Sequence, residues 1–276
     1  MEVVTDTLVS RVISLAIPHY NNAQYIMDAI GMCIRDNRVS EIVICDDCSA
    51  DIVELEKIVK LFSCMSNKIR LYKNERNLGC FHNKLNALSK CTNEWAILLD
   101  ADNIIQKDYI DRLFEFHEWN HGVIYHPCWA KMFPTKPGVP TENMDFRLYE
   151  NQYITPSVFL AEFEKSQNAK FHCLLNNCNY FLPVAHFLKC MREQEEQFVF
   201  VREKMDILDS TTLFVNWLCS GNQVYVVKNL TYQHRIHNSS NCVVSPSRTY
   251  RDEVNRELYD RIVRYMETEK EQLNSL

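Results

Sequence analysis

The stretch Trp95-Ala96-Ile97-Leu98-Leu99-Asp100-Ala101-Asp102 is an apolar run that leads directly into two carboxylates one residue apart. Its apolar part, residues 95–99, predicts a buried strand. The two acids at its end could hold a hard divalent cation, because such ions are usually bound by one or two carboxylates together with substrate phosphates. An acidic loop without a metal would show the same short pattern, so the neighbouring segments decide between the two interpretations.

In the rest of the first half, short apolar runs alternate with segments whose apolar residues have helical spacing. Strands are predicted over residues 12–17, 41–45, 69–72, 95–99 and 123–125, and helices over 23–35, 51–62, 81–89 and 107–119. Strands that alternate with helices of this length imply crossover connections and a parallel sheet covered by helices on both faces. The fold class predicted from this pattern is α/β.

Polar residues follow four of the predicted strands. They are Asn21 and Asn22, Asp46 and Asp47, Asn77 and Lys84, and Asp100 and Asp102. In open sheets of this class, ligands bind outside the carboxyl ends of the strands. We therefore expect these side chains to meet at one rim of the sheet.

The composition is that of an ordinary globular protein, with 276 residues, 46% apolar residues and 24% charged residues. The formal net charge of −6 gives no support to nucleic-acid binding, which usually shows a basic footprint. No apolar run approaches the roughly 18 residues of a transmembrane segment, and residues 1–11 lack the layout of a secretory signal. We expect a soluble, cytoplasmic protein with reduced cysteines, and leave peripheral association with a membrane open.

The second half is less regular. Prolines interrupt residues 127–168, while a helix that includes Leu213 and Leu218 ends at Gly221 and a strand follows over 223–227. The charged tail, residues 251–271, carries apolar residues on one face and predicts an amphipathic helix packed on the body. We expect one domain over residues 1–245, made of a regular half over 11–126 and a less regular half over 127–245, and a helical extension over 246–276.

Four segments resemble the motifs of the family 2 inverting glycosyltransferases, which have the GT-A (Rossmann-like) fold. They are Ile17-Pro18-His19-Tyr20-Asn21, Ile44-Cys45-Asp46-Asp47-Cys48-Ser49-Ala50-Asp51, Asn77-Leu78-Gly79 and Leu99-Asp100-Ala101-Asp102. The resemblance covers roughly residues 11 to 126 and returns more weakly from 174 to 240. It implies a mostly parallel sheet flanked by helices, in which residues 11–126 form the nucleotide-sugar-binding half and residues 127–245 form a mixed acceptor-side half.

The resemblance also implies an activity. Such an enzyme moves a sugar, with inversion, from a nucleoside diphosphate donor of the uridine or thymidine type to a hydroxyl of a glycan, a lipid-linked acceptor or a protein. It would use Mn²⁺ or Mg²⁺, which acts as a Lewis acid on the departing diphosphate. Asp102 would ligate the cation, and Asp100 would reach the ribose hydroxyls or a metal-bound water.

The same resemblance assigns the nucleotide-binding residues. Asp47 would accept a hydrogen bond from the base, with the backbone near Pro18 and Tyr20 beside the ring. Turn formation is the alternative for Asp46 and Asp47, and we expect one of the two to do each job. Lys84 would lie near the diphosphate, or else be a solvated helix lysine. The remaining members of the predicted nucleotide site are Asn21, Asn77 and Ala101.

An inverting transfer needs a general base that deprotonates the acceptor hydroxyl. Relatives carry it about eleven residues before a glycine, a position that holds Ser210 in this chain. Serine cannot serve alone, so we favour Asp209 as the base, with Asp206 as the alternative. Asp209 could instead be a helix N-cap that shares this role with Ser210.

Three further residues complete the predicted site. His237 resembles a late family histidine that would add a metal ligand, and Asn177 and Asn179 fall in a region that contacts the donor sugar or the acceptor. Two other functions stay open. One is a catalytically weak or inactive homologue that binds nucleotide-sugar, suggested by Ser210. The other is a nucleotidyltransferase, although residues 18–23 lack the glycine-rich phosphate loop that such enzymes use.

Overall fold

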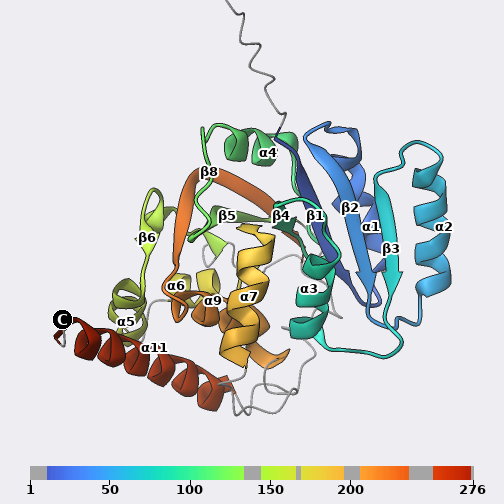
Figure 1. Ribbon diagram of the computed structural model, residues 1–276. Helices are drawn as coiled ribbons and strands as arrows, with labels where there is room; N and C mark the ends of the chain where they lie inside the picture. Colours follow the sequence, from blue (N-terminus) through green and yellow to red (C-terminus); the bar gives the residue numbers. More distant parts are fainter. Residues whose placement is uncertain (1–10, 134–143, 166–168, 196–205, 236–250, 275–276) are drawn as a thin grey trace, which may run out of the picture.

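A mixed eight-stranded sheet runs through the part of the protein that the computed structural model describes, residues 11–133, 144–165, 169–195, 206–235 and 251–274 (Figure 1). Its strand order is β3-β2-β1-β4-β7-β5-β8-β6. The strands are β1 (Ile13–His19), β2 (Val39–Asp46), β3 (Ile69–Lys73), β4 (Trp95–Leu98), β5 (Val123–Phe133), β6 (Tyr153–Ile154), β7 (Phe181–Pro183) and β8 (Gln223–Arg235).

Helices flank this sheet. The α-helices are α1 (Ile26–Gly31), α2 (Ile52–Ser63), α3 (Cys80–Ser89), α4 (Lys107–Phe114), α5 (Pro156–Glu164), α6 (Ala169–Leu175), α7 (Val184–Glu195), α9 (Asp209–Leu218) and α11 (Arg251–Asn274). Short 3-10 turns are η1 (Ala23–Tyr25), η2 (Cys33–Arg35), η4 (Arg147–Tyr149) and η5 (Asp206–Leu208). Helices α3, α7 and α9 pack together, while α1 and α2 pack together with η1 (Figure 1). The predicted α/β fold class is confirmed.

The first half follows the predicted alternation closely. β1 pairs in parallel with β2 and β4, and β2 pairs in parallel with β3. β1, β2 and β4 are almost continuously buried, as expected when helices cover both faces of a parallel sheet, whereas β3 is partly exposed. Their carboxyl ends therefore point to the same edge.

Four predicted elements were wrong in extent. The helix expected over 107–119 ends at Phe114, and the strand expected over 223–227 continues to Arg235. The single helix expected over 23–35 is divided into η1, α1 and η2. Gly31 lies within this segment, and glycine is costly in a helix interior, whereas 3-10 turns are common at helix ends. The strand expected over 123–125 continues to Phe133, because it pairs with β8 along most of its length.

The two halves share one sheet because β7 lies between β4 and β5. It runs antiparallel to both neighbours. The ring of Phe181 on β7 stacks on Trp95 with centroids 5.0 Å apart and meets the edge of Trp119 at 4.7 Å. This aromatic cluster packs at the boundary between the first and second halves of the sheet.

The C-terminal helix α11 packs on α5, α9 and η5, and lies along one side of the molecule (dark red in Figure 1). Its apolar stripe, Val254, Leu258 and Ile262, is buried, as predicted for packing on the body. Arg261 donates to Asn216 Oδ1 at 2.7 Å and to Gln194 Oε1 at 2.8 Å. None of the helices in the described ranges combines the length and apolar character needed to cross a bilayer.

Candidate active site

Four strand exits deliver polar side chains to one rim, as the sequence predicts. At the first exit, Asn21 adopts a left-handed backbone conformation (φ 52°) that asparagine tolerates. Its amide N–H donates to Ser49 Oγ at 2.9 Å, and its side-chain oxygen accepts from Ala50 N at 2.8 Å. These bonds tie the exit of β1 to the exit of β2. Tyr20 is half exposed beside them, and Pro18 is partly buried.

Asp46 is the last residue of β2, and its carboxylate bonds to two nearby residues. Its Oδ1 accepts from His19 Nδ1 at 2.9 Å, and its Oδ2 accepts from Ser49 N at 3.1 Å. Burial opposes ionisation of Asp46, but these hydrogen bonds outweigh it and lower the pKa of the carboxyl below its ordinary value. Asp46 therefore forms the turn rather than facing the open rim.

His19, Asp46 and Asp51 have ligand atoms within 4.8 Å of one another, close enough for a metal ion. Both ring nitrogens of His19 are already engaged, because Nε2 accepts from Asn22 N at 3.3 Å while Nδ1 contacts Asp46. Asp51 Oδ2 accepts from Ala23 N at 2.8 Å. We interpret this cluster as a hydrogen-bonded link between β1 and β2, not as the catalytic metal site.

Asp47 reaches across to the segment before α3. Its Oδ1 accepts from Leu78 N at 2.7 Å and from Asn74 Nδ2 at 2.8 Å, and its Oδ2 accepts from Gly79 N at 2.9 Å. Asn77 donates to the carbonyl oxygen of Asp47 at 3.2 Å. Both Asp46 and Asp47 thus have turn-forming contacts, whereas the sequence suggested that one of them would. Recognition of the nucleotide base by Asp47 stays a prediction.

Asp100 follows β4 and is held by Asn179. The Asn179 side chain accepts from Asp100 N at 2.8 Å and donates to Asp100 Oδ2 at 3.1 Å. Asn177 in turn accepts from Asn179 Nδ2 at 3.1 Å. Asn177 and Asn179 are buried, which favours a supporting role beneath Asp100; the predicted contact with sugar stays untested.

Ala101 is buried beside Asp100, and the backbone of Asp102 is fixed by Arg235 at the end of β8. Arg235 Nε donates to the carbonyl oxygen of Asp102 at 3.0 Å, and Arg235 Nη2 lies 2.6 Å from Asp28 Oδ2. Asn103 Oδ1 accepts from Arg235 N at 3.0 Å. Sequence reasoning did not single out Asp28 or Asn103. Asn103 could have been found from its position directly after the Asp-x-Asp motif.

Lys84 lies between Asp100 and Asp209. Its ammonium group lies 3.3 Å from Asp100 Oδ1 and makes a short ion pair with Asp209 Oδ2. Lys84, counted as a whole residue, is 6% exposed, so the alternative of a solvated helix lysine was wrong. Burial opposes its charge, but Asp100 and Asp209 outweigh burial and raise the pKa of Lys84 well above its ordinary value.

Asp100 responds to the same neighbours. Burial opposes its ionisation, but the charges of Lys84 and His234 and the hydrogen bond from Asn179 lower the pKa of Asp100. His234 follows Gln233, whose backbone pairs with Ile104 just after the Asp-x-Asp motif. The predicted metal ligand His237 lies outside the described residues.

The two candidate bases have different surroundings. Asp206 Oδ1 accepts from Phe81 N at 2.9 Å, in the first turn of α3, and burial raises the pKa of Asp206. Asp209 begins α9, whose N-cap is Leu208 without a side-chain cap. The N-cap alternative for Asp209 was therefore wrong. Ser210, the next residue of α9, is buried.

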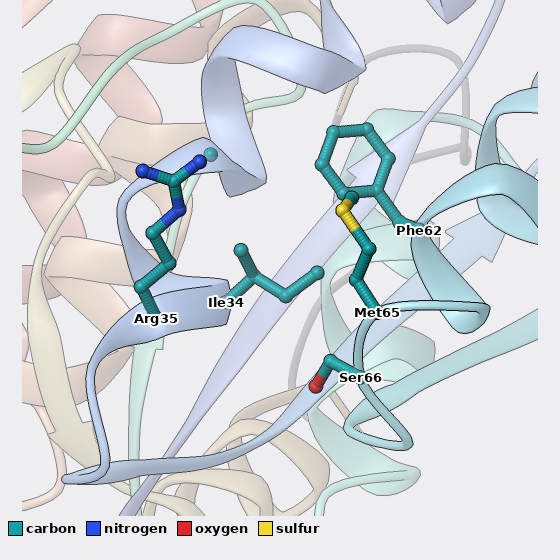
Figure 2. A pocket seen from close by; sticks show the side chains of 6 residues that line it. Ile34, Arg35, Phe62, Met65 and Ser66 are labelled. Atoms are coloured by element: carbon teal, nitrogen blue, oxygen red, sulfur yellow. The ribbon is translucent and has the colours of Figure 1, made fainter.

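A cavity of about 210 Å³ lies elsewhere (Figure 2). It is lined by Gly31, Ile34, Arg35, Phe62, Met65 and Ser66. These residues come shortly before β2 and β3 begin, whereas the polar residues of the rim follow the strands. The cavity therefore belongs to the opposite edge of the sheet and is separate from the rim.

The sequence profile described as Glycosyl transferase family 2 matches residues 14–181, more than half of the chain. The chain belongs to this family. The matched region includes β1 to β4, the Asp-x-Asp motif and Asn179. It ends before Asp206 and Asp209, so the family match does not cover the candidate bases.

Curated relatives agree with this family. The chain is 25% identical over 107 residues to glycosyltransferase GlyG of Streptococcus pneumoniae serotype 4, covering 38% of this chain and 35% of GlyG. It is also 25% identical over 203 residues to an uncharacterized glycosyltransferase of Haemophilus influenzae, covering 68% of this chain and 75% of that protein. The alignment thus spans about a third of the length of GlyG.

Solved structures share the GT-A fold. Residues 1–349 of S. aureus TarS in complex with UDP superpose with a TM-score of 0.58 at 17% identity, covering 92% of this chain and 65% of that chain. GalNAc-T7 with UDP, GalNAc and Mn²⁺ gives a TM-score of 0.56 at 13% identity, covering 88% of this chain and 47% of that chain. At these identities the likeness concerns the fold.

Proposed function

We propose that this family 2 protein is a metal-dependent inverting glycosyltransferase that moves a sugar from a uridine diphosphate donor to a hydroxyl acceptor. The observation that carries the proposal is the convergence of Asp100 and Asp209 on Lys84, which brings a candidate metal ligand and a candidate base to one point of the rim. The UDP in the TarS structure and the UDP and Mn²⁺ in the GalNAc-T7 structure support this donor and this metal. A thymidine-type donor is the alternative.

The residues at the rim fit a divalent cation. Asp100 has a lowered pKa and is therefore ionised at neutral pH, and its side chain is 30% exposed. Asp102 supplies a second carboxylate two positions along the chain. Hard oxygen donors of this kind suit Mn²⁺ and Mg²⁺. When bound, the cation would neutralise negative charge on the leaving diphosphate.

Asp209 would carry out the proton transfer. The acceptor hydroxyl gives its proton to the Asp209 carboxylate while its oxygen bonds to the anomeric carbon. The bond between that carbon and the diphosphate oxygen breaks on the opposite face, and its electron pair leaves with the nucleoside diphosphate. The product is inverted at the anomeric carbon. Asp206 suits this step less well, because it is occupied with the first turn of α3.

The test is incubation of the protein with UDP-sugars and Mn²⁺, with UDP release as the measurement. Water can serve as the acceptor where the natural acceptor is unidentified. Metal-dependent release supports the proposal. Tight UDP binding without release, even with a panel of hydroxyl acceptors, would instead support the nucleotide-sugar-binding homologue suggested by Ser210.

The variant Asp102→Asn tests the assignment of the metal site. We expect it to abolish Mn²⁺-dependent UDP binding and UDP release together, because one of two carboxylate ligands is lost. Asp108→Asn, on the exposed side of α4, is the control and should behave as wild type. Full activity of Asp102→Asn would overturn the metal assignment.

A further inference from the structure

We propose that Lys84 is a positioning residue that orients the candidate base Asp209 from beneath the site, rather than a diphosphate ligand. The inference rests on the proposed function and deepens it. Three observations carry it: the relative exposure of the three charged groups, the way α3 is anchored, and the position of Asp209 at the start of α9.

The exposed fractions of the three charged side chains show that Lys84 lies deeper than Asp100 and Asp209. The side chains of Asp100 and Asp209 are 30% and 18% exposed, whereas that of Lys84 is 8% exposed. An incoming diphosphate would therefore meet the carboxylate side of the cluster first. Lysine is rarely buried unless it is paired, and here both carboxylates supply that pairing. The ammonium group thus supports the two acids from below.

Hydrogen bonds hold helix α3, which carries Lys84, in place. Asp47 holds the segment before the helix through Leu78 N and Gly79 N. Asn83, next to Lys84, donates to the carbonyl oxygen of Cys45 at 3.0 Å, which ties the helix to β2. Because the backbone of Lys84 is anchored to the nucleotide side of the rim, its ammonium group is held in a defined place.

The segment that carries the base is attached to the same helix at two points. Asp206 bonds to Phe81 N at 2.9 Å, and Asp209 pairs with Lys84 about one turn further along. Among the described residues, Lys84 is the hydrogen-bond partner found for the Asp209 carboxylate. Without Lys84, the rotamer of Asp209 would no longer be fixed. A displacement of about 1 Å at a reacting group can lower the rate by roughly 100-fold.

The experiment separates positioning from diphosphate binding. For Lys84→Met we expect kcat for UDP release to fall at least roughly tenfold, while the Kd of UDP with Mn²⁺ stays within about threefold of wild type. Lys84→Arg keeps the charge and should recover part of the lost turnover. Lys90→Met, at the exposed end of the same helix, is the matched control and should retain wild-type kcat. If Lys84→Met does not fold, Lys84→Gln carries the same expectation.

The outcomes are distinct. A Kd for UDP that weakens more than tenfold, while the Kd for uridine is unchanged, would make Lys84 a diphosphate ligand and overturn the inference. Unchanged kcat in both neutral variants would also overturn it. If the wild-type protein shows no turnover with any donor or acceptor, the proposed function fails, and the positioning role that rests on it fails as well.

Discussion

Asn179 holds Asp100 at two points, accepting from its backbone N–H at 2.8 Å and donating to its carboxylate at 3.1 Å. This pair fixes both the backbone and the side chain at the start of the Asp-x-Asp motif. Groups that orient metal ligands in this way often contribute strongly to metal affinity.

Replacement of Asn179 should therefore weaken metal binding without direct loss of a ligand. For Asn179→Ala we expect the Mn²⁺ concentration needed for half-maximal UDP binding to rise about tenfold. Isothermal titration of UDP at several Mn²⁺ concentrations measures this. Asn120→Ala, at an exposed turn, is the control. An unchanged metal requirement would show that Asp100 needs no such support.

Asp209→Asn should leave donor binding intact and remove transfer. The amide cannot accept the proton of the acceptor hydroxyl, so we expect kcat to fall by roughly 100-fold or more. UDP affinity with Mn²⁺, measured alongside, should stay near that of the wild type. Transfer at the wild-type rate would show that another group, with Asp206 the first candidate, acts as the base.

Asp206→Ala should affect stability more than chemistry. The change removes the acceptor for Phe81 N in the first turn of α3, a loss that typically costs about 1 kcal/mol of unfolding free energy. Denaturant unfolding gives the stability, and UDP release gives the activity.

Gly79→Ala tests the same contact from the other side. A Cβ at Gly79, where φ is 84°, would lie 2.0 Å from Asp206 Oδ2. We expect a comparable or larger loss of stability, because the carboxylate must move and the backbone is strained. A large loss of kcat in a folded Asp206→Ala protein would contradict the structural role given to Asp206.

His126 predicts a pH dependence of stability. Its ring is buried on β5, and burial lowers its pKa to about 4. Between this value and the ordinary pKa of about 6.5, the unfolded chain binds a proton that the folded protein excludes, so stability falls as pH falls. From pH 7 to pH 5 this residue should cost about 2 kcal/mol.

The measurement compares urea unfolding at the two pH values. In His126→Gln, the drop in unfolding free energy between pH 7 and pH 5 should be smaller by that amount. His117→Gln, with a side chain 97% exposed in the wild type, should leave the drop unchanged. Equal drops in wild type and His126→Gln would show that His126 is protonated without cost.

The strand exits could be predicted because their signals are local. An apolar run followed by acids marks a strand end, and parallel strands bring such ends to one edge. Asp47, Asp100 and Asp102 were found in this way. Long-range pairs carry no such signal: Asn179 and Asp100 are separated by 79 positions, and Lys84 and Asp209 by 125.

The order of the sheet was also beyond local patterns. β7 is three residues long, too short for a clear period, and its place between β4 and β5 depends on the packing of Phe181 against Trp95 and Trp119. Lys84 was ambiguous for a related reason. A lysine in a helical segment is expected on the protein surface unless its buried carboxylate partners are known.

Arg261 has a practical consequence for truncated forms of this protein. Its guanidinium group reaches from α11 to Asn216 on α9 and Gln194 on α7, next to the buried stripe of Val254, Leu258 and Ile262. A truncated version that stopped before α11 would uncover apolar surface and the side-chain oxygens of Asn216 and Gln194, and Asn216 lies on the helix that Asp209 begins. Shortened or tagged forms of the protein should therefore keep α11 whole.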